Sequence, residues 1–210
     1  MSVSSGSEVL ETIQRIRAIA QTGLTYASDD YDRERYAELR QLAVDLLAVR
    51  LEEPPERVAD VYLLEQGYPT PKIDVRAGVF REGQVLLVRE SSDDCWSLPG
   101  GWGDEHDSPR GCIEREVFEE SGFRVRAVKL VGVKDRHLHP YTPRRLERIY
   151  KLFFLCELLG GEARGSIETT EVRFFAPNAS PTLSLGRTLQ ADIELLEKHR
   201  NDPSLPTYFD

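Results

Sequence analysis

The chain has 210 residues, 40% of them hydrophobic and 9% aromatic, which excludes a disordered protein and suffices for one large or two small domains. The net charge is −9, and this surplus of negative charge argues against binding to a nucleic acid backbone. Residues 1–8 lack the apolar run of a signal peptide, and the apolar stretch 152–159 is too short to span a bilayer. With three widely spaced cysteines that fit reduced thiols, we expect a cytoplasmic protein without a membrane contact.

The first third of the chain carries apolar residues at helical spacing in three runs. The first predicted helix ends at Gly23, and the third begins at Pro54 or Pro55 and ends at Gly67. The second is predicted from about residue 30, with a buried side made of Tyr36, Leu39, Leu42, Ala43, Leu46, Leu47 and Val49. Three short helices enclose little interior, so we expect this bundle to dock an exposed apolar stripe against another surface.

The spacing of apolar residues changes from helical to strand-like after a proline-containing stretch. Strands are predicted at 73–79, 85–88, 123–133, 149–158 and 172–176. Two helices are predicted among them, from Ser108 to Ser121 and from 188 to about 200. This order favours an α+β fold with a mixed sheet between helices. We therefore expect a helical domain at 1–67 and a linker at 68–72. A second domain should follow at 73–200, and a tail at 201–210.

Three carboxylates share one face of the helix predicted to begin at Ser108. Glu116, Glu119 and Glu120 follow one another at spacings of three and one, which places them within little more than a quarter-turn. Like charges three or four apart repel each other, and a divalent cation that prefers oxygen ligands would relieve the repulsion. The alternative is a solvated acidic helix face.

The segment 98–102 reads Leu-Pro-Gly-Gly-Trp and leads into this helix, and its glycines would let the backbone approach an ion or ligand closely. Loop and helix together resemble the Nudix box over 23 positions. Gly101 opens the box, and the residues in register are Arg115, Glu116, Val117, Glu119, Glu120, Gly122 and Phe123. Asp107 stands where the box usually has Glu, which keeps the charge but shortens the side chain.

Resemblance to Nudix hydrolases implies an α/β/α sandwich and a metal-dependent pyrophosphatase, whose catalytic residues would include Arg115, Glu119 and Glu120. It further implies that Glu116, Glu119 and Glu120 bind two or more Mg²⁺ or Mn²⁺ ions, with the carbonyl of Gly100 as a further ligand. Arg115 would orient one glutamate by a salt bridge. A diphosphate repels nucleophiles by its own charge, so cations that neutralise it and acidify a water supply what side chains cannot.

The catalytic base is left open between two carboxylates. Nudix enzymes often draw a further acid from a loop before a late strand, and Glu168 and Glu171 are placed in that way. The alternative for each is an exposed turn residue.

A local excess of positive charge lies in 134–151, with six Lys or Arg against two acids. This segment could clamp substrate phosphates through Lys134, Arg136 and His137, or it could be a charged loop and strand edge. Trp102 could stack on a base, although an aromatic residue beside a glycine-rich loop often only packs.

Residues 18–39 resemble the N-terminal helical domain of a Nudix subgroup that hydrolyses nucleoside diphosphates linked to a group X. Such enzymes act on small nucleotides such as ADP-ribose or CDP-choline, give a nucleoside monophosphate and phospho-X, and are commonly dimers. The resemblance therefore implies a homodimer. The identities of the base and of X are not readable from the sequence, because specificity resides in loops.

Two other readings remain. The enzyme could act on another Nudix substrate, such as a dinucleoside polyphosphate, a dNTP or an RNA end. Alternatively, the chain could be a non-catalytic regulator that senses nucleotides. Against the regulator stand the complete set of box glutamates and the 13 acids against 7 bases in residues 1–70, which would oppose DNA.

Overall fold

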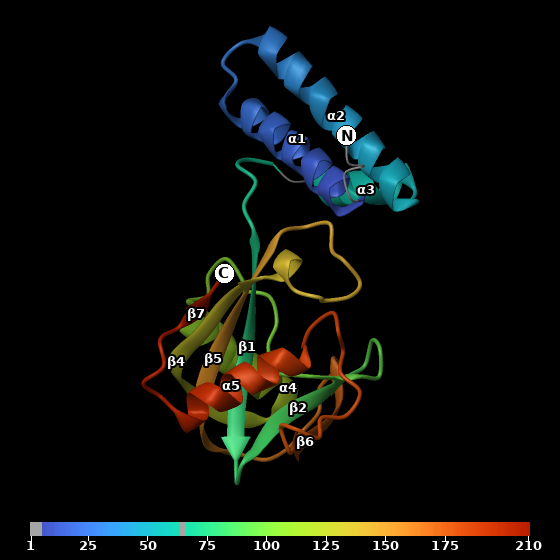
Figure 1. Ribbon diagram of the computed structural model, residues 1–210. Coiled ribbons are helices and arrows are strands. Elements are labelled where there is room, and N and C mark those ends of the chain that lie inside the picture. The colour runs from blue at the N-terminus through green and yellow to red at the C-terminus, as the bar shows by residue number, and fades with distance from the viewer. Residues whose placement is uncertain (1–5, 64–65) are drawn as a thin grey trace. The chain divides into compact units, whose positions relative to one another are not determined.

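The structure, a computed structural model, describes residues 6–63 and 66–210 (Figure 1). Its internal contacts divide the chain into two compact units, Met1–Thr70 and Pro71–Asp210. In the described part of the chain, every helix is too short or too polar to cross a membrane. The cytoplasmic location expected from the sequence stays a prediction.

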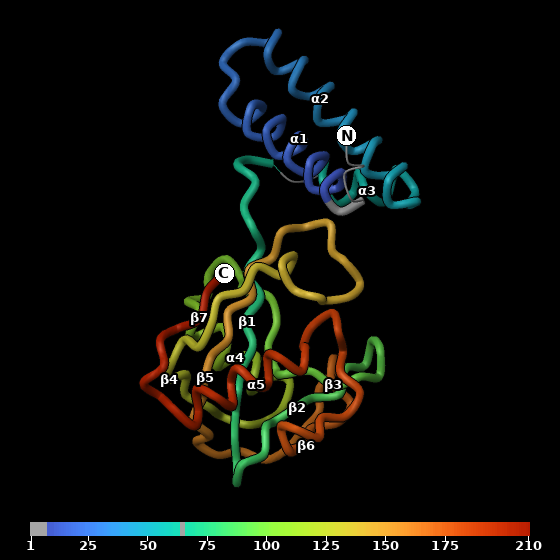
Figure 2. Tube along the Cα trace, in the orientation of Figure 1, coloured from blue at the N-terminus to red at the C-terminus, as the bar shows by residue number. Residues whose placement is uncertain are grey.

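The first unit is made of helices α1 (Gly6–Tyr26), α2 (Asp30–Leu51) and α3 (Pro55–Tyr62). Helices α1 and α2 form a hairpin and lie side by side, as the chain trace in Figure 2 shows. Helix α1 continues past Gly23, so the predicted end of this helix was wrong. A Cβ at Gly23 would lie 2.5 Å from the ring of Tyr36, so this glycine allows close packing of the two helices and does not end one.

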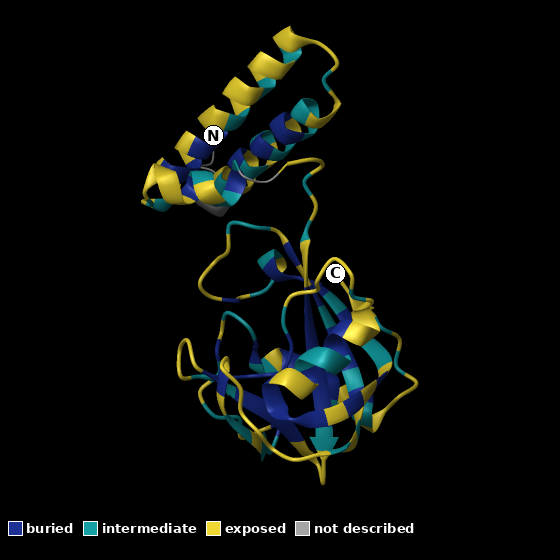
Figure 3. Cartoon of the chain, turned by 180° about the vertical axis from the view of Figure 1, so that it is seen from behind, coloured by how far each residue is buried: buried dark blue, intermediate teal, exposed yellow. Residues whose placement is uncertain are grey.

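Helix α2 buries only one of the two sides that its apolar residues could cover. Its buried residues are Ala43, Val44, Leu47 and Ala48. The prediction of the buried side was therefore partly wrong, because a bundle this thin covers α2 on one side only. Most of α2 is accordingly coloured yellow, for exposed, in the cartoon of Figure 3. Exposed leucine and valine residues continue along the helix. We call this set the apolar stripe, and it consists of Leu39, Leu42, Leu46 and Val49.

The second unit contains a mixed sheet with the strand order β3-β2-β1-β5-β4-β7, and β6 pairs with β2. Strand β1 pairs in parallel with β5 and forms an antiparallel hairpin with β2. The strands are β1 (Lys72–Arg81), β2 (Gln84–Glu90), β3 (Trp96–Ser97), β4 (Phe123–Asp135), β5 (Ile149–Gly161), β6 (Thr169–Phe175) and β7 (Tyr208–Phe209). The sequence did not predict the two-residue strands β3 and β7. Strand β7 belongs to the segment 201–210, expected as a tail, and pairs in parallel with β4.

Helices α4 (Pro109–Ser121) and α5 (Gln190–Asn201) cover opposite faces of this sheet (Figure 1). Helix α4 begins where predicted, because the Ser108 hydroxyl accepts a hydrogen bond from the Gly111 N–H at 3.1 Å. It ends at Gly122, whose φ of 75° suits glycine. Helix α5 begins later than predicted, because the Thr188 hydroxyl instead accepts a hydrogen bond from the Leu98 N–H at 2.9 Å.

The two faces of the sheet bury different side chains of β1. Val75 and Ala77 pack with Ile113 and Val117 of α4. On the opposite face, where α5 contributes Ile193 and Leu196 to the core, β1 instead carries charged residues. The helical unit and the α/β/α unit together confirm the predicted fold class.

Candidate active site

A cavity of about 440 Å³ lies where the loop after β3, helix α4 and the loop before β6 meet. Five carboxylates and one arginine line it, and we call it the acidic pocket. Its size is typical of sites for small molecules. The lining residues are Gly101, Trp102, Asp104, Arg115, Glu116, Glu119, Glu120, Ser166, Ile167 and Glu168.

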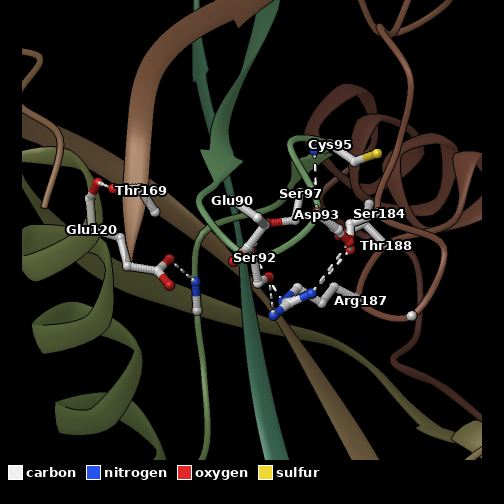
Figure 4. A network of polar contacts seen from close by, with 12 residues as sticks. Glu90, Ser92, Asp93, Cys95, Ser97, Glu120, Thr169, Ser184, Arg187 and Thr188 are labelled. Carbon is white, nitrogen blue, oxygen red and sulfur yellow. Dashed lines mark hydrogen bonds and ion pairs between the residues drawn. The ribbon is translucent and has the colours of Figure 1, made fainter. Parts of the chain in front are cut away.

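Glu120 is the most deeply buried of these carboxylates, with 5% of its surface exposed. The Gly100 N–H donates a hydrogen bond to its Oε2 at 2.8 Å. Burial raises the pKa of Glu120 to about 8, although Arg76 and the Gly100 N–H oppose this shift. The Thr169 hydroxyl donates to the backbone carbonyl of Glu120 at 2.6 Å, which ties the end of α4 to the start of β6 (Figure 4).

The two glycines of the loop let its backbone lie directly against β1 and Glu116. Gly100 has a φ of +137°, and a Cβ there would lie 2.0 Å from the Val75 carbonyl oxygen. A Cβ at Gly101 would lie 2.6 Å from Oε2 of Glu116. The sequence predicted close approach of this backbone to an ion or ligand; the structure shows it against β1 and Glu116, and the approach to an ion or ligand stays a prediction. The contact of Gly100 with Glu120 is made by its N–H, and the predicted role of its carbonyl as a metal ligand stays a prediction.

Arg115 holds the remaining box carboxylates. Its guanidinium donates to Glu116 and to Glu119, each at 2.8 Å, and to Asp107 at 2.6 Å. The shorter side chain of Asp107 therefore still reaches the arginine, and it links the loop to α4. Arg115 thus acts on two glutamates, where the sequence predicted one, and we regard it as a positioning residue.

The carboxylates of the acidic pocket have the chemistry that divalent cations require, since Mg²⁺ and Mn²⁺ prefer hard oxygen ligands. Burial also raises the pKa of Glu116, so a cation nearby would stabilise the ionised forms of both Glu116 and Glu120. Within 6–63 and 66–210, no three Asp, Glu, His or Cys side chains are already gathered around one point. Glu119 and Glu116 would therefore have to turn from Arg115 to bind a shared cation.

The structure separates the two candidates for the catalytic base. Glu168 lies in the loop before β6 and lines the acidic pocket. Glu171 is outside this lining: the register of β6 places it opposite Arg89, which donates to it at 2.5 Å, and Arg173 also pairs with it. The hydrogen bond from Arg89 lowers the pKa of Glu171.

The residues predicted to bind substrate are dispersed. Trp102 lines the acidic pocket, and Arg136 lines a second, smaller cavity. Lys134 lines neither, since it is buried in an ion pair with Asp192 at 2.7 Å. His137 also lines neither, and its Nε2 lies 3.1 Å from a backbone carbonyl. Of the three residues predicted to clamp substrate phosphates from the segment 134–151, only Arg136 therefore lines a cavity.

The sequence missed a buried ionic triad on the α5 face of the sheet. Asp74 accepts two hydrogen bonds from Arg76, both at 2.9 Å, and one from Lys151 at 2.7 Å. Burial would raise the pKa of Asp74, but Arg76 and Lys151 outweigh burial and lower it to about 2. In the alternating pattern of β1, Asp74 and Arg76 occupy the polar positions, which usually face solvent, and Lys151 lies on the neighbouring strand β5. Here α5 and the loops cover that face too.

Family membership follows from two matches that together span most of the chain. Residues 70–197 match the model of the NUDIX domain, and residues 7–62 match a model described as a UDP-X-like, N-terminal oligomerisation domain. The chain belongs to the Nudix family. The predicted family and enzyme class are thus confirmed, and the protein is a Nudix pyrophosphatase, a hydrolase of phosphoanhydrides.

Similar proteins match nearly the whole chain or about two thirds of it. YjhB of Bacillus subtilis, a candidate ADP-ribose pyrophosphatase, is 42% identical over 201 residues, which are 96% of each chain. The crystal structure of a UDP-X diphosphatase is 34% identical, with a TM-score of 0.62, and the match covers 99% of this chain and 100% of that one. An ADP-ribose pyrophosphatase from Streptococcus suis is 39% identical, with a TM-score of 0.61, over 67% of this chain and 100% of that one.

Proposed function

We propose that this Nudix enzyme cleaves the diphosphate bond of nucleoside diphosphates linked to a group X, such as ADP-ribose or CDP-choline. Water attacks a phosphorus of the anhydride, and the products are a nucleoside monophosphate and phospho-X. The observation that carries the proposal is the convergence of Glu116, Glu119, Glu120 and Glu168 on one cavity. The UDP-X-like N-terminal domain and the names of the similar proteins support this substrate class.

Glu116, Glu119 and Glu120 would hold the divalent cations, and we expect two or more Mg²⁺ or Mn²⁺ ions in the acidic pocket. Such ions would neutralise the charge of the diphosphate and make a water acidic enough to attack it. Arg115 positions Glu116 and Glu119, and the Gly100 N–H fixes the carboxylate of Glu120.

Glu168 is the catalytic base in this proposal, because it is the base candidate that lines the acidic pocket. Glu168→Gln is expected to lower kcat by about 10² to 10⁴ with little change in KM, since the attacking water loses its proton acceptor. Glu171→Gln should change kcat by less than about threefold, because it breaks only a surface ion pair with Arg89 and Arg173. Steady-state kinetics of both variants on one substrate measure the difference. A large loss in Glu171→Gln with little loss in Glu168→Gln would reverse the assignment.

The substrate class is tested by product analysis. The protein is incubated with Mg²⁺ or Mn²⁺ and a panel of ADP-ribose, CDP-choline, UDP-sugars, dinucleoside polyphosphates, dNTPs and triphosphorylated RNA, and products are separated by chromatography. We expect a nucleoside monophosphate and phospho-X, and no activity after chelation of the metal. Release of inorganic pyrophosphate from a dNTP or an RNA end as the fastest reaction would favour another Nudix substrate. Nucleotide binding without turnover of any compound would favour the regulator.

We also propose that the apolar stripe of α2 is a homodimer contact. Its leucines Leu42 and Leu46 are 52% and 53% exposed, and a matching surface on a second copy would cover them. The description of the N-terminal model as an oligomerisation domain supports this.

Replacing Leu42 and Leu46 together by Glu is expected to give a monomer at micromolar concentration in sedimentation equilibrium, because the proposed dimer contact would then bury charged side chains. Leu159→Glu, at a leucine of β5 that is 59% exposed, is the matched control and should stay dimeric. A wild-type monomer, or an unchanged dimer in the double variant, would contradict this contact.

A further inference from the structure

A second cavity, of about 70 Å³, shares a lining residue with the acidic pocket, and we call it the basic pocket. Trp102 belongs to the walls of both. Five cations and one carboxylate line the basic pocket: Arg76, Arg136, Arg145, Lys151, Arg187 and Asp74. The two neighbouring cavities thus have opposite charge.

Carboxylates neutralise only some of these cations. Asp74 accepts hydrogen bonds from both Arg76 and Lys151, so one carboxylate is shared by two cations. Arg187 pairs with Glu90 at 3.2 Å and with Asp93 at 3.5 Å, in the polar network drawn in Figure 4.

Arg136 and Arg145 are the cations of the basic pocket that have no carboxylate partner within the part of the chain the structure describes. Arg136 donates only to backbone carbonyls, of Pro143 at 2.7 Å and of Gly186 at 3.5 Å. The three carboxylates in contact with these five cations are fewer than the cations, so positive charge prevails in the lining of the basic pocket.

The charged form of Arg136 is destabilised in the basic pocket. This residue is only 4% exposed, and burial together with the nearby charge of Arg145 lowers its pKa. The charges of Asp74 and Glu147 oppose this shift but do not outweigh it. An anion in the pocket would therefore stabilise the charged form of Arg136 further. Arginine side chains bind phosphate oxygens in paired hydrogen bonds, which makes phosphate a suitable anion.

The volume of the basic pocket and the charge of its lining limit which kind of phosphate group it can bind. Pockets that hold a whole small molecule are typically about 300–1,000 Å³, so a cavity of about 70 Å³ holds one group of a larger ligand. A phosphate monoester carries about −1.5 to −2 at neutral pH, more than a diester phosphate, and therefore suits a pocket in which positive charge prevails. The phosphates of a diphosphate diester carry one charge each and belong with the metal-binding carboxylates of the acidic pocket.

We propose that the basic pocket binds a phosphate monoester on the substrate, so that the enzyme selects nucleoside diphosphate–X compounds that carry an additional phosphate. The inference rests on the proposed function, because it assumes that the diphosphate of the same molecule occupies the acidic pocket. Within the proposed substrate class, a compound with a cationic X, such as CDP-choline, would be cleaved less efficiently than one that carries this phosphate.

The first test compares substrates that differ by one phosphate monoester. Coenzyme A against its 3′-dephospho form probes the nucleoside half, and ADP-ribose 1″-phosphate against ADP-ribose probes the X half. We expect kcat/KM to be at least about tenfold higher for the phosphorylated member of one pair, and this ratio to fall towards one in Arg145→Gln. Arg145 is exposed, so this variant should fold. The control Arg126→Gln loses an exposed ion pair with Glu157 and should keep the ratio.

The second test does not depend on turnover. With metal chelated, millimolar inorganic phosphate should raise the Tm of the wild type and of Arg126→Gln, and should leave the Tm of Arg145→Gln and Arg136→Gln unchanged. Equal kcat/KM within both substrate pairs, or equal stabilisation of Arg145→Gln and wild type by phosphate, would overturn the proposal. If no compound in the panel were hydrolysed, the proposed function would fail, and the phosphate titration alone would decide on the basic pocket.

Discussion

Glu120→Gln is expected to lower kcat by at least about a thousandfold, or ~4 kcal/mol of transition-state stabilisation, while leaving the fold intact. Glutamine has nearly the same volume as glutamate, and its Oε1 can accept the hydrogen bond that the Gly100 N–H now donates to Glu120. The substitution removes the negative charge that would hold a divalent cation at the most buried position of the acidic pocket. A neutral amide also binds such a cation far more weakly than a carboxylate does.

Initial rates with Mg²⁺ and with Mn²⁺ measure the effect, and circular dichroism checks the fold. Glu194→Gln makes the same change at an exposed position of α5 and should retain full activity. Activity of Glu120→Gln within a few-fold of wild type would refute the metal assignment, whichever substrate is used.

Asp74→Asn is expected to lower the free energy of unfolding of the unit Pro71–Asp210 by about 3–5 kcal/mol. The substitution leaves two buried cations, Arg76 and Lys151, without their shared carboxylate. For a unit of this size the loss corresponds to a decrease in Tm of roughly 10 °C, measurable by calorimetry. Glu157→Gln breaks only an exposed pair with Arg126 and should cost less than about 1 kcal/mol. Equal stability of the two variants would contradict a structural role for the triad.

The free energy of unfolding of the wild type should decrease at acid pH because Asp74 becomes protonated. Its pKa is lowered from 3.8 to about 2 in the folded state, so between these values the unfolded chain binds the proton more readily. The stabilisation of roughly 2 kcal/mol is complete above the unfolded pKa and is lost as the pH falls through about 2. Denaturant unfolding of wild type between pH 4 and 2 should show this decrease, and Asp74→Asn should show a smaller one.

The parts of the site that could be predicted are those formed by neighbouring residues in the chain. The cap at Ser108, the αL glycine at Gly122 and the face of Glu116, Glu119 and Glu120 depend on helix geometry alone, so residue spacing sufficed to locate them. The Nudix box is likewise a pattern of residues that are close in the chain, so the sequence sufficed to predict the family, which the match to the NUDIX domain confirmed.

Local spacing could not choose between Glu168 and Glu171, since both occupy a plausible segment near the start of one strand. The pairing of β6 with β2 decided their environments, because it set Glu171 opposite Arg89 and left Glu168 in the loop that lines the acidic pocket. Likewise, the sequence could not show which apolar residues of α2 are buried and which form the exposed apolar stripe. Burial on this helix depends on which other helices pack against it.

By itself, the sequence determined the family, the caps and length of α4, and the set of carboxylates on one helix face, because these depend on contacts within a few residues. The tertiary structure alone decided the basic pocket, whose cations come from β1, β5, the segment that follows β4 and the loop before α5. Residues 76 and 187 are distant in the chain, and only the folding of both faces of the sheet brings their charges to one cavity. Alternation along β1 marked Asp74 and Arg76 as polar positions, but burial of a charge depends on what the rest of the chain places above it.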